Sequence, residues 1–305
     1  MESREHLGYS YEQILQVVKF LKLVVPNFKP LVGVICGSGL GPLADSLSDK
    51  IEVPYEDIPL FPASTVVGHG GKLVFGTVGG VPVICMKGRF HAYEGYPLWK
   101  VVMPVRVMRL MGVEYLIVTN AAGGIPSSMN VGDIMIIKDH VNMMGMGGQN
   151  PLRGPNIEEF GPRFPAMNKT YDRALVKAGL KIAESLGMED MTHEGVYGCV
   201  GGPNYETIAE LLMLQSCGVD SVGMSTAHEV IAAGHCGMKV FGFSLITNKA
   251  ILDYDSSEVP NHEEVIAAAK AKEAKLQGFT EAMIKHMGSL KNAGPPSMCS
   301  CGGRR

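Results

Sequence analysis

Two kinds of apolar pattern alternate along the chain, and together they predict an α/β fold. Short apolar runs rich in β-branched residues are typical of buried strands, whereas apolar residues at every third or fourth position are typical of helices. The strands are predicted at 31–36, 73–78, 81–86, 115–119, 134–137, 194–200 and 240–247. The helices are predicted from Ser10 to before Pro26 and at 98–111, 172–186, 206–216 and 261–287.

Residues with special backbone preferences mark the ends of these elements. Ser10 and Gln13 have the spacing of a capping box, and Gly79-Gly80 between two apolar runs predicts a hairpin. Pro104 predicts a break in the 98–111 helix. The segment 120–124 is interpreted as a loop of small residues. The Gly-, Pro- and Asn-rich segment 142–165 is expected to be a long loop with a functional or interface role.

The alternation of strands and helices predicts one α/β domain over 1–290, with a mixed, largely parallel central sheet flanked by helices. Residues 291–305 lack periodicity and are expected to form a disordered tail. Neither an internal repeat nor a linker is apparent before residue 290.

Composition narrows the classes of function. Of the 305 residues, 46% are hydrophobic and 19% are charged, which is far from the composition of disordered chains. A net charge of −3 disfavours non-specific binding to nucleic acid or to an anionic membrane. The seven cysteines show no disulfide framework, the N-terminus does not resemble a secretory signal, and the apolar runs are too short to span a bilayer. We therefore expect a cytoplasmic protein.

Two segments hold candidate anion-binding groups. Gly37-Ser38-Gly39-Leu-Gly41 follows a predicted strand, so its backbone N–H groups and the Ser38 hydroxyl could converge on an anion. Its spacing is not that of a dinucleotide-binding loop, and a plain turn is the alternative. In Arg89-Phe-His91-Ala-Tyr93 the polar residues alternate, so an extended segment would place all three on one side. Arg89 offers a bidentate fork for phosphate, and His91 a second donor.

Four further segments are ambiguous when taken singly. The segment 120–124 lies where open α/β sheets bind ligands, yet it could be a turn. Glu206 at a helix start could be a dipole partner or cap, and Ser225 could be a cap. Asn248 could make a turn, and His262 could lie on the surface. No zinc spacing, Walker loop or nucleophile elbow is present, and Cys299 and Cys301 are interpreted as tail thiols.

Taken together and in this order, these segments resemble the trimeric, low-molecular-mass purine nucleoside phosphorylases. The resemblance extends from about Tyr9 to Met287. The strings that carry it are GSGLG (37–41), GRFHAYEGY (88–96), TNAAGG (119–124), NPLRGPN (150–156), GPNYET (202–207), GMST (223–226) and SLITNK (244–249).

The resemblance implies reversible phosphorolysis of inosine and guanosine, and of their deoxy forms, to free base and (deoxy)ribose 1-phosphate, a purine-salvage reaction. It implies no cofactor and no metal, with inorganic phosphate as co-substrate, and a homotrimer. Catalysis would involve Asn248, His91 and Glu206. Phosphate would be held by Ser38, Arg89, His91, the Ala121 backbone N–H and Ser225, with His69 nearby. The nucleoside would contact Tyr93, Phe164 of a neighbouring subunit, Tyr205, Glu206, Val222, Gly223, Met224, Thr247, Asn248 and His262.

The sequence departs from the family at two places. Many members have Phe at the position of Tyr205, and mammalian relatives usually have Val-Pro where this chain has Ala227-His228. Three alternatives stay open. Methylthioadenosine phosphorylases usually carry Asp in place of Asn248 and lack a Glu like Glu206. A non-catalytic nucleoside-binding protein should have lost the pair Arg89 and His91. A nicotinamide-dependent dehydrogenase would need an acidic residue at the end of a strand, at the required distance after 37–41, and Glu52 and Glu56 lie instead in a Pro-bearing segment.

Overall fold

The structure is a computed structural model that describes residues 8–37, 40–62, 71–259 and 262–292. Within these residues, nine strands form one mixed sheet in the order β2-β3-β4-β1-β5-β8-β7-β6-β9, and β9 also pairs with β5. The strands are β1 (Val32–Cys36), β2 (Ser48–Pro54), β3 (Lys72–Val78), β4 (Val81–Lys87), β5 (Tyr115–Gly124), β6 (Ile134–Asn142), β7 (Thr192–Cys199), β8 (Ser221–Gly223) and β9 (Lys239–Lys249).

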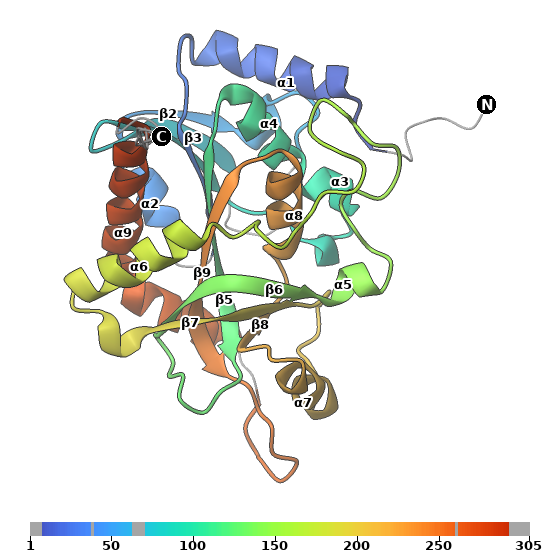
Figure 1. Ribbon diagram of the computed structural model, residues 1–305, viewed down its shortest axis with the longest axis vertical. Helices are drawn as coiled ribbons and strands as arrows, with labels where there is room; N and C mark the ends of the chain where they lie inside the picture. The colour runs from blue at the N-terminus through green and yellow to red at the C-terminus, as the bar shows by residue number, and fades with distance from the viewer. Residues whose placement is uncertain (1–7, 38–39, 63–70, 260–261, 293–305) are drawn as a thin grey trace, which may run out of the picture.

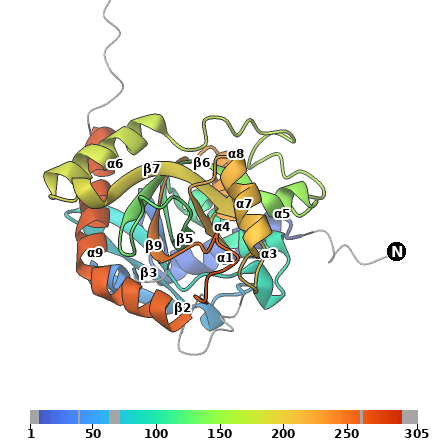
Figure 2. The same cartoon turned by 90° about the horizontal axis from the view of Figure 1, so that it is seen from below.

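Helices cover both faces of the sheet. Two extended apolar clusters, one on each face, pack under them. Figure 1 shows α1, α3, α4 and α8 on one side and α2, α6 and α9 on the other, and Figure 2 shows the same division from below. The helices are α1 (Tyr11–Val24), α2 (Gly41–Asp45), α3 (Leu98–Val101), α4 (Met103–Met111), α5 (Met143–Met146), α6 (Arg173–Ser185), α7 (Ile208–Ser216), α8 (Ala227–His235) and α9 (His262–Asn292).

Strand β1 illustrates why the inner strands are continuous apolar runs. Its five residues are all buried, with Ile35 in one apolar cluster and Val34 in the other. It pairs in parallel with both β4 and β5. A strand covered on both faces needs apolar side chains at every position. The predicted mixed sheet flanked by helices is confirmed.

Three local predictions are also confirmed. Ser10 and Gln13 close a capping box at the start of α1. The hairpin of β3 and β4 turns through Gly79 and Gly80, which both have positive φ. The helix predicted across Pro104 is broken at Val102, which ends α3 and precedes α4.

Several other predictions need correction. The segment 120–124 is not a loop, because β5 continues through it to Gly124 with β9 and β8 on either side. Tyr93 lies in a 3₁₀ turn (Ala92–Glu94), so the segment from Arg89 to Tyr93 is not extended throughout. Helix α9 reaches Asn292, beyond the predicted start of the tail at 291, and residues 293–305 lie outside the described residues. The elements β2, α2 and β8 were not predicted, nor was the short helix α5 within the segment 142–165 that was expected to be a loop.

The pairing of β5 with β9 closes part of the sheet on itself. Strands β5, β8, β7, β6 and β9 form a ring, whereas β1, β4, β3 and β2 continue outward from β5 as an open sheet. Residues 119–122 of β5 lie between the end of its pairing with β1, at Val118, and the start of its pairing with β8, at Gly123. Within the described chain, no helix is long and apolar enough to cross a membrane.

Candidate active site

The candidate site begins at this interruption in the sheet. On the side of β5 that faces β1 and β8, the described pairings leave residues 119–122 without a ladder partner. Main-chain groups there need other partners, because buried backbone groups are costly to leave unpaired. The main-chain carbonyl of Thr119 accepts from Arg89 Nη1 at 2.7 Å. The Thr119 side chain also bonds the end of β1, because its Oγ1 accepts from the Gly37 N–H at 2.8 Å.

Arg89 is the buried cation of this region. Its side chain is only 4% exposed, and its Nε donates to Glu229 Oε1 at 2.8 Å while Nη1 donates to the Thr119 carbonyl. Its Nη2 is buried and has no hydrogen-bond partner in the described residues. A buried guanidinium nitrogen without an acceptor is costly. This nitrogen is therefore suited to an anionic oxygen entering the gap beside β5.

Ser225, also predicted for phosphate, stands at the start of α8. Its Oγ lies 3.1 Å from Thr226 Oγ1, which accepts from Asn120 Nδ2 at 2.9 Å, and the Ser225 N–H donates to the Tyr197 hydroxyl at 3.3 Å. Ser225 is not the helix cap, because Thr226 occupies that position. Asn120 thus links β5 to the turn that holds Ser225.

His91 and Tyr93 follow Arg89 and lie together. Their rings stack with centroids 4.6 Å apart and planes 16° apart. Burial, reinforced by the positive charge of Arg89, lowers the pKa of His91, although Glu229 and Glu94 partly oppose this. The carboxylate Oε1 of Glu94 accepts from the His91 N–H at 2.8 Å and lies 3.2 Å from its Nδ1.

A pocket of about 230 Å³ lies further along β5, beyond the phosphate-side groups. Four of the predicted nucleoside residues line it, and Figure 1 shows α7, whose first residues also contribute, at this end of the sheet. The volume is below the roughly 300–1,000 Å³ of pockets for drug-sized ligands, and it suits a flat heterocycle. The lining residues among those predicted are Tyr205, Glu206, Val222 and Asn248.

An irregularity between β5 and β9 sets the position of Asn248. Ala122 pairs with Ile246 but Gly123 pairs with Asn248, so Thr247 is an extra residue, as in a β-bulge. The Asn248 amide lies against Gly123, where a Cβ would stand 3.2 Å from Nδ2. The Thr247 hydroxyl lies 3.3 Å from Asn248 Oδ1 and 3.4 Å from the Ala122 carbonyl oxygen, so its single proton is shared between these two acceptors. With Oδ1 turned toward Thr247, the NH₂ group of Asn248 is left to donate to other acceptors.

Glu206 is not the cap of α7. The cap is Thr207, which forms a capping box with Glu210. The Glu206 carboxyl is free of that task and lines the pocket. Burial raises the pKa of Glu206. The alternative reading of Glu206 as a cap is therefore wrong.

The remaining predicted residues are less directly placed. Gly223 packs against Tyr197 and the Ala121 carbonyl, and Met224 packs against Gly202, which has positive φ. Phe164 is 87% exposed and far from enclosed, with Arg163 over its ring. Ser38 and His69 lie outside the described residues, and so does the side chain of His262, the first residue of α9.

Sequence reasoning missed residues that support these groups. Glu229, Thr226, Asn120 and Tyr197 are buried and hydrogen-bond Arg89 or the Ser225 turn. Glu229 had one signal, a carboxylate in the first turn of a largely apolar helix. A carboxylate in such a buried position requires a partner, but the sequence does not indicate that this partner is Arg89, 140 positions away.

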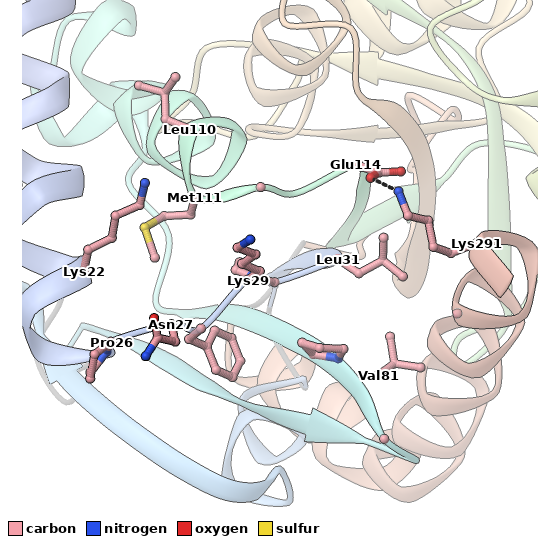
Figure 3. Close-up of a pocket in the computed structure, with 16 residues that line it drawn as sticks. Lys22, Pro26, Asn27, Lys29, Leu31, Val81, Leu110, Met111, Glu114 and Lys291 are labelled. Carbon is pink, nitrogen blue, oxygen red and sulfur yellow. Dashed lines mark hydrogen bonds and ion pairs between the residues drawn. The ribbon is translucent and has the colours of Figure 1, made fainter.

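A second cavity, of about 850 Å³, lies elsewhere. Figure 3 shows it between the end of α1, the β3–β4 hairpin, the end of α4 and the end of α9. Its rim carries Lys22, Lys29 and Lys291, and Lys291 is paired with Glu114. None of the predicted site residues lines it. Among the described residues, no group of three or more His, Cys, Asp or Glu could hold a metal ion.

Comparisons with known proteins agree with this arrangement. The sequence model of the phosphorylase superfamily matches residues 31–285. The purine nucleoside phosphorylase of Anopheles gambiae is 53% identical over 287 residues, which are 94% of this chain and 81% of that protein. The purine nucleoside phosphorylase of Bos taurus is 52% identical over 277 residues, 91% of this chain and 96% of that protein.

Solved structures give the same relationship. The purine nucleoside phosphorylase of Schistosoma mansoni in complex with inosine is 47% identical, with a TM-score of 0.89, and the match covers 92% of this chain and 98% of that one. The complex of the schistosome enzyme with adenosine gives a TM-score of 0.88. The chain belongs to the phosphorylase superfamily and, within it, to the purine nucleoside phosphorylases.

Proposed function

We propose that the protein catalyses reversible phosphorolysis of inosine and guanosine, and of their deoxy forms, to purine base and (deoxy)ribose 1-phosphate. The single observation that carries the proposal is the buried Nη2 of Arg89, which has no hydrogen-bond partner in the described residues. Arg89 contacts Thr119 of β5, and the same strand continues to Gly123, which lines the base-sized pocket. Thr119 and Gly123 are four residues apart on β5, about 13 Å in an extended strand. That separation leaves room for a sugar between the two.

In the proposed mechanism, Arg89, His91, Ser225, Ser38 and the Ala121 N–H bind inorganic phosphate, with His69 nearby. The phosphate is the nucleophile at the anomeric carbon, and its negative charge stabilises the positive charge that develops on the sugar. The phosphate attacks directly as the glycosidic bond breaks, so no covalent enzyme intermediate is formed. The proposed reaction uses neither a metal nor an organic cofactor.

The departing base is stabilised from the other end of the site. Asn248 donates to N7 and O6 of the purine, which gain negative charge as the bond breaks. Glu206 accepts from N1–H of a 6-oxopurine. The ring of Tyr205 packs on the face of the base, which Val222, Gly223 and Thr247 enclose. Tyr93, Met224 and His262 contact the ribose.

We also propose a cytoplasmic homotrimer in which Phe164 completes the site of an adjacent subunit. The five described cysteines are free, which suits a reducing compartment. Phe164 is far too exposed to contribute to the site of its own chain as described. The domain would comprise residues 1–290.

The test is the release of hypoxanthine from inosine with and without phosphate or arsenate. We expect turnover only with the oxyanion, and a loss of most activity in Arg89→Ala. That variant removes the guanidinium from the proposed phosphate site and leaves Glu229 buried without its partner. Equal turnover without phosphate would indicate a hydrolase and contradict the proposal.

The same assay separates the alternatives. A methylthioadenosine phosphorylase would prefer the 5′-methylthio substrate, and the two pocket residues that argue against it, Asn248 and Glu206, both line the base pocket. A non-catalytic binding protein would release no base. A nicotinamide-dependent enzyme would be indifferent to phosphate.

A further inference from the structure

We infer that Glu229 is a positioning residue of the phosphate site, which holds the guanidinium of Arg89 so that one nitrogen is left for phosphate. The inference rests on the proposed function. Glu229 comes from α8, 140 positions away from Arg89 in sequence, and nothing in the family resemblance assigned it a role.

The hydrogen bonds of Arg89 define the geometry. Arg89 Nε donates to Glu229 Oε1 at 2.8 Å, and Nη1 donates to the Thr119 carbonyl at 2.7 Å. Because the guanidinium is planar, fixing two nitrogens fixes the direction of the third. Without Glu229, the group would be held only by the Thr119 carbonyl and could rotate about that bond.

The choice of acceptor is unusual for an anion-binding site. A carboxylate beside Arg89 cancels the charge that would attract phosphate, and Glu229 is itself only 3% exposed at its side chain. If phosphate affinity depended on net charge alone, Glu229 would weaken the site. Its burial beside the cation is explained if orienting the guanidinium raises phosphate affinity by more than the neutralised charge lowers it.

The turn before Glu229 connects it to Ser225. Thr226 has φ 74° and ψ −54°, and the Ala227 N–H donates to the Ser225 carbonyl at 2.8 Å, which is a γ-turn. This turn is strained for a β-branched residue and is held by the bond from Asn120 to Thr226. The same helix start thus presents Ser225 and the partner of Arg89. Ser225 and the carboxylate that holds Arg89 are therefore positioned by the same turn at the start of α8.

The experiment compares Glu229→Ala, Glu229→Gln and Glu229→Asp with wild type, using KM for phosphate, KM for inosine, and the rise of Tm with added inorganic phosphate. Gln keeps an oxygen that can accept from Arg89 Nε, whereas Ala removes it. Asp keeps the negative charge, but its side chain is one methylene shorter and withdraws the carboxylate from Nε. We expect KM for phosphate to rise about tenfold or more in the Ala and Asp variants and to stay near wild type in Gln. KM for inosine should change little in all three.

Two controls separate positioning from other roles. Glu114→Ala removes a carboxylate partner of a lysine at the remote cavity and should leave KM for phosphate unchanged. Adding Glu229→Ala to Arg89→Ala should cause no further rise in KM for phosphate, because the group that Glu229 positions is already gone.

The outcomes are distinct. Tighter phosphate binding in Glu229→Ala and Glu229→Gln alike would mean that only charge matters, and would overturn the inference. Unchanged KM for phosphate in a folded Ala or Asp variant would also overturn it. If Ala does not fold, the comparison of Asp with Gln decides. Wild-type turnover that needs no phosphate would instead refute the proposed function.

Discussion

In the proposed function, the protonation state of Glu206 determines which edge of a purine it can bind. As a carboxylate it can only accept, which matches N1–H of a 6-oxopurine and opposes the acceptor at N1 of adenine. Burial raises the pKa of Glu206, so its acid form persists to higher pH than for a surface glutamate. The acid form can donate to N1 of adenine, whereas for N1–H of a 6-oxopurine it keeps only the weaker, uncharged carbonyl oxygen as acceptor.

We therefore expect the selectivity for inosine over adenosine to decrease as the pH is lowered. Above the raised pKa, inosine should be preferred over adenosine by about 10⁴-fold, the value typical when a polar site is left unpaired. As pH falls toward that pKa, the ratio of kcat/KM for inosine to kcat/KM for adenosine should decrease. Glu206→Gln, which does not titrate, should show a ratio independent of pH over the same range. A wild-type ratio that rises or stays constant on acidification would contradict this assignment.

In the proposed function, Asn248 contributes to selectivity from the other side of the base. Its Oδ1 lies 3.3 Å from the Thr247 hydroxyl, which leaves the NH₂ group for N7 and O6. Asn248→Asp should lower the same inosine-to-adenosine ratio, because a carboxylate can accept from the 6-amino group and, when protonated, still donate to N7. The matched control is Thr247→Val, which removes the orienting hydroxyl and should lower kcat for both substrates. No fall of the ratio in Asn248→Asp would show that Asn248 does not read the base.

At the scale of elements, the phosphate side depends on how closely β1 approaches β5. A Cβ at Gly37 would overlap the Thr119 carbonyl oxygen and lie 2.8 Å from the Asn120 Cα. Because these are backbone atoms, they cannot rotate away, and the end of β1 would have to move from β5. Gly41, four positions later in the same glycine-rich segment, has only Lys87 Cε at 3.6 Å.

These two glycines form a matched pair for mutation. Gly37→Ala should lower the free energy of unfolding by about 1–3 kcal/mol, the usual cost of overpacking, and raise KM for phosphate. Gly41→Ala should leave both nearly unchanged. Urea unfolding and steady-state kinetics on both variants provide the check. Equal effects at the two positions would mean that the tight approach of β1 to Thr119 is unimportant.

Elements with a strong local signal could be predicted from the sequence, and those fixed by pairing could not. The cap at Ser10 and the turn at Gly79-Gly80 depend on neighbouring residues only, and both are confirmed. The small residues 120–124 have the composition of a loop, but partners far away in sequence hold them as strand. The extra residue at Thr247 is likewise invisible in a pattern, because it exists only relative to β5.

At the scale of the whole molecule, the site is assembled from segments that are distant in sequence. Arg89, Glu206 and Asn248 could be named from their strings because the family resemblance carries residue types. Their supports, such as Glu229 and Asn120, could not, since a support is recognised by its contact with another segment. Sequence therefore indicates which groups are candidates for the chemistry, while the tertiary structure is needed to see what orients them.

Phe164 extends this argument beyond a single chain. Its ring is 87% exposed in the long segment between β6 and α6, whereas most phenylalanines of this chain are buried in the apolar clusters. An exposed aromatic side chain of this size suits an interface.

We expect light scattering at assay concentration to give the mass of a trimer. Phe164→Ala should raise KM for nucleoside while KM for phosphate stays nearly constant, since the proposed aromatic contact is with the nucleoside of the adjacent subunit. The control is Tyr254→Ala, at a 72% exposed side chain outside the predicted site, which should change neither constant. A fully active monomer, or equal effects of Phe164→Ala on both substrates, would show that each chain forms its site alone.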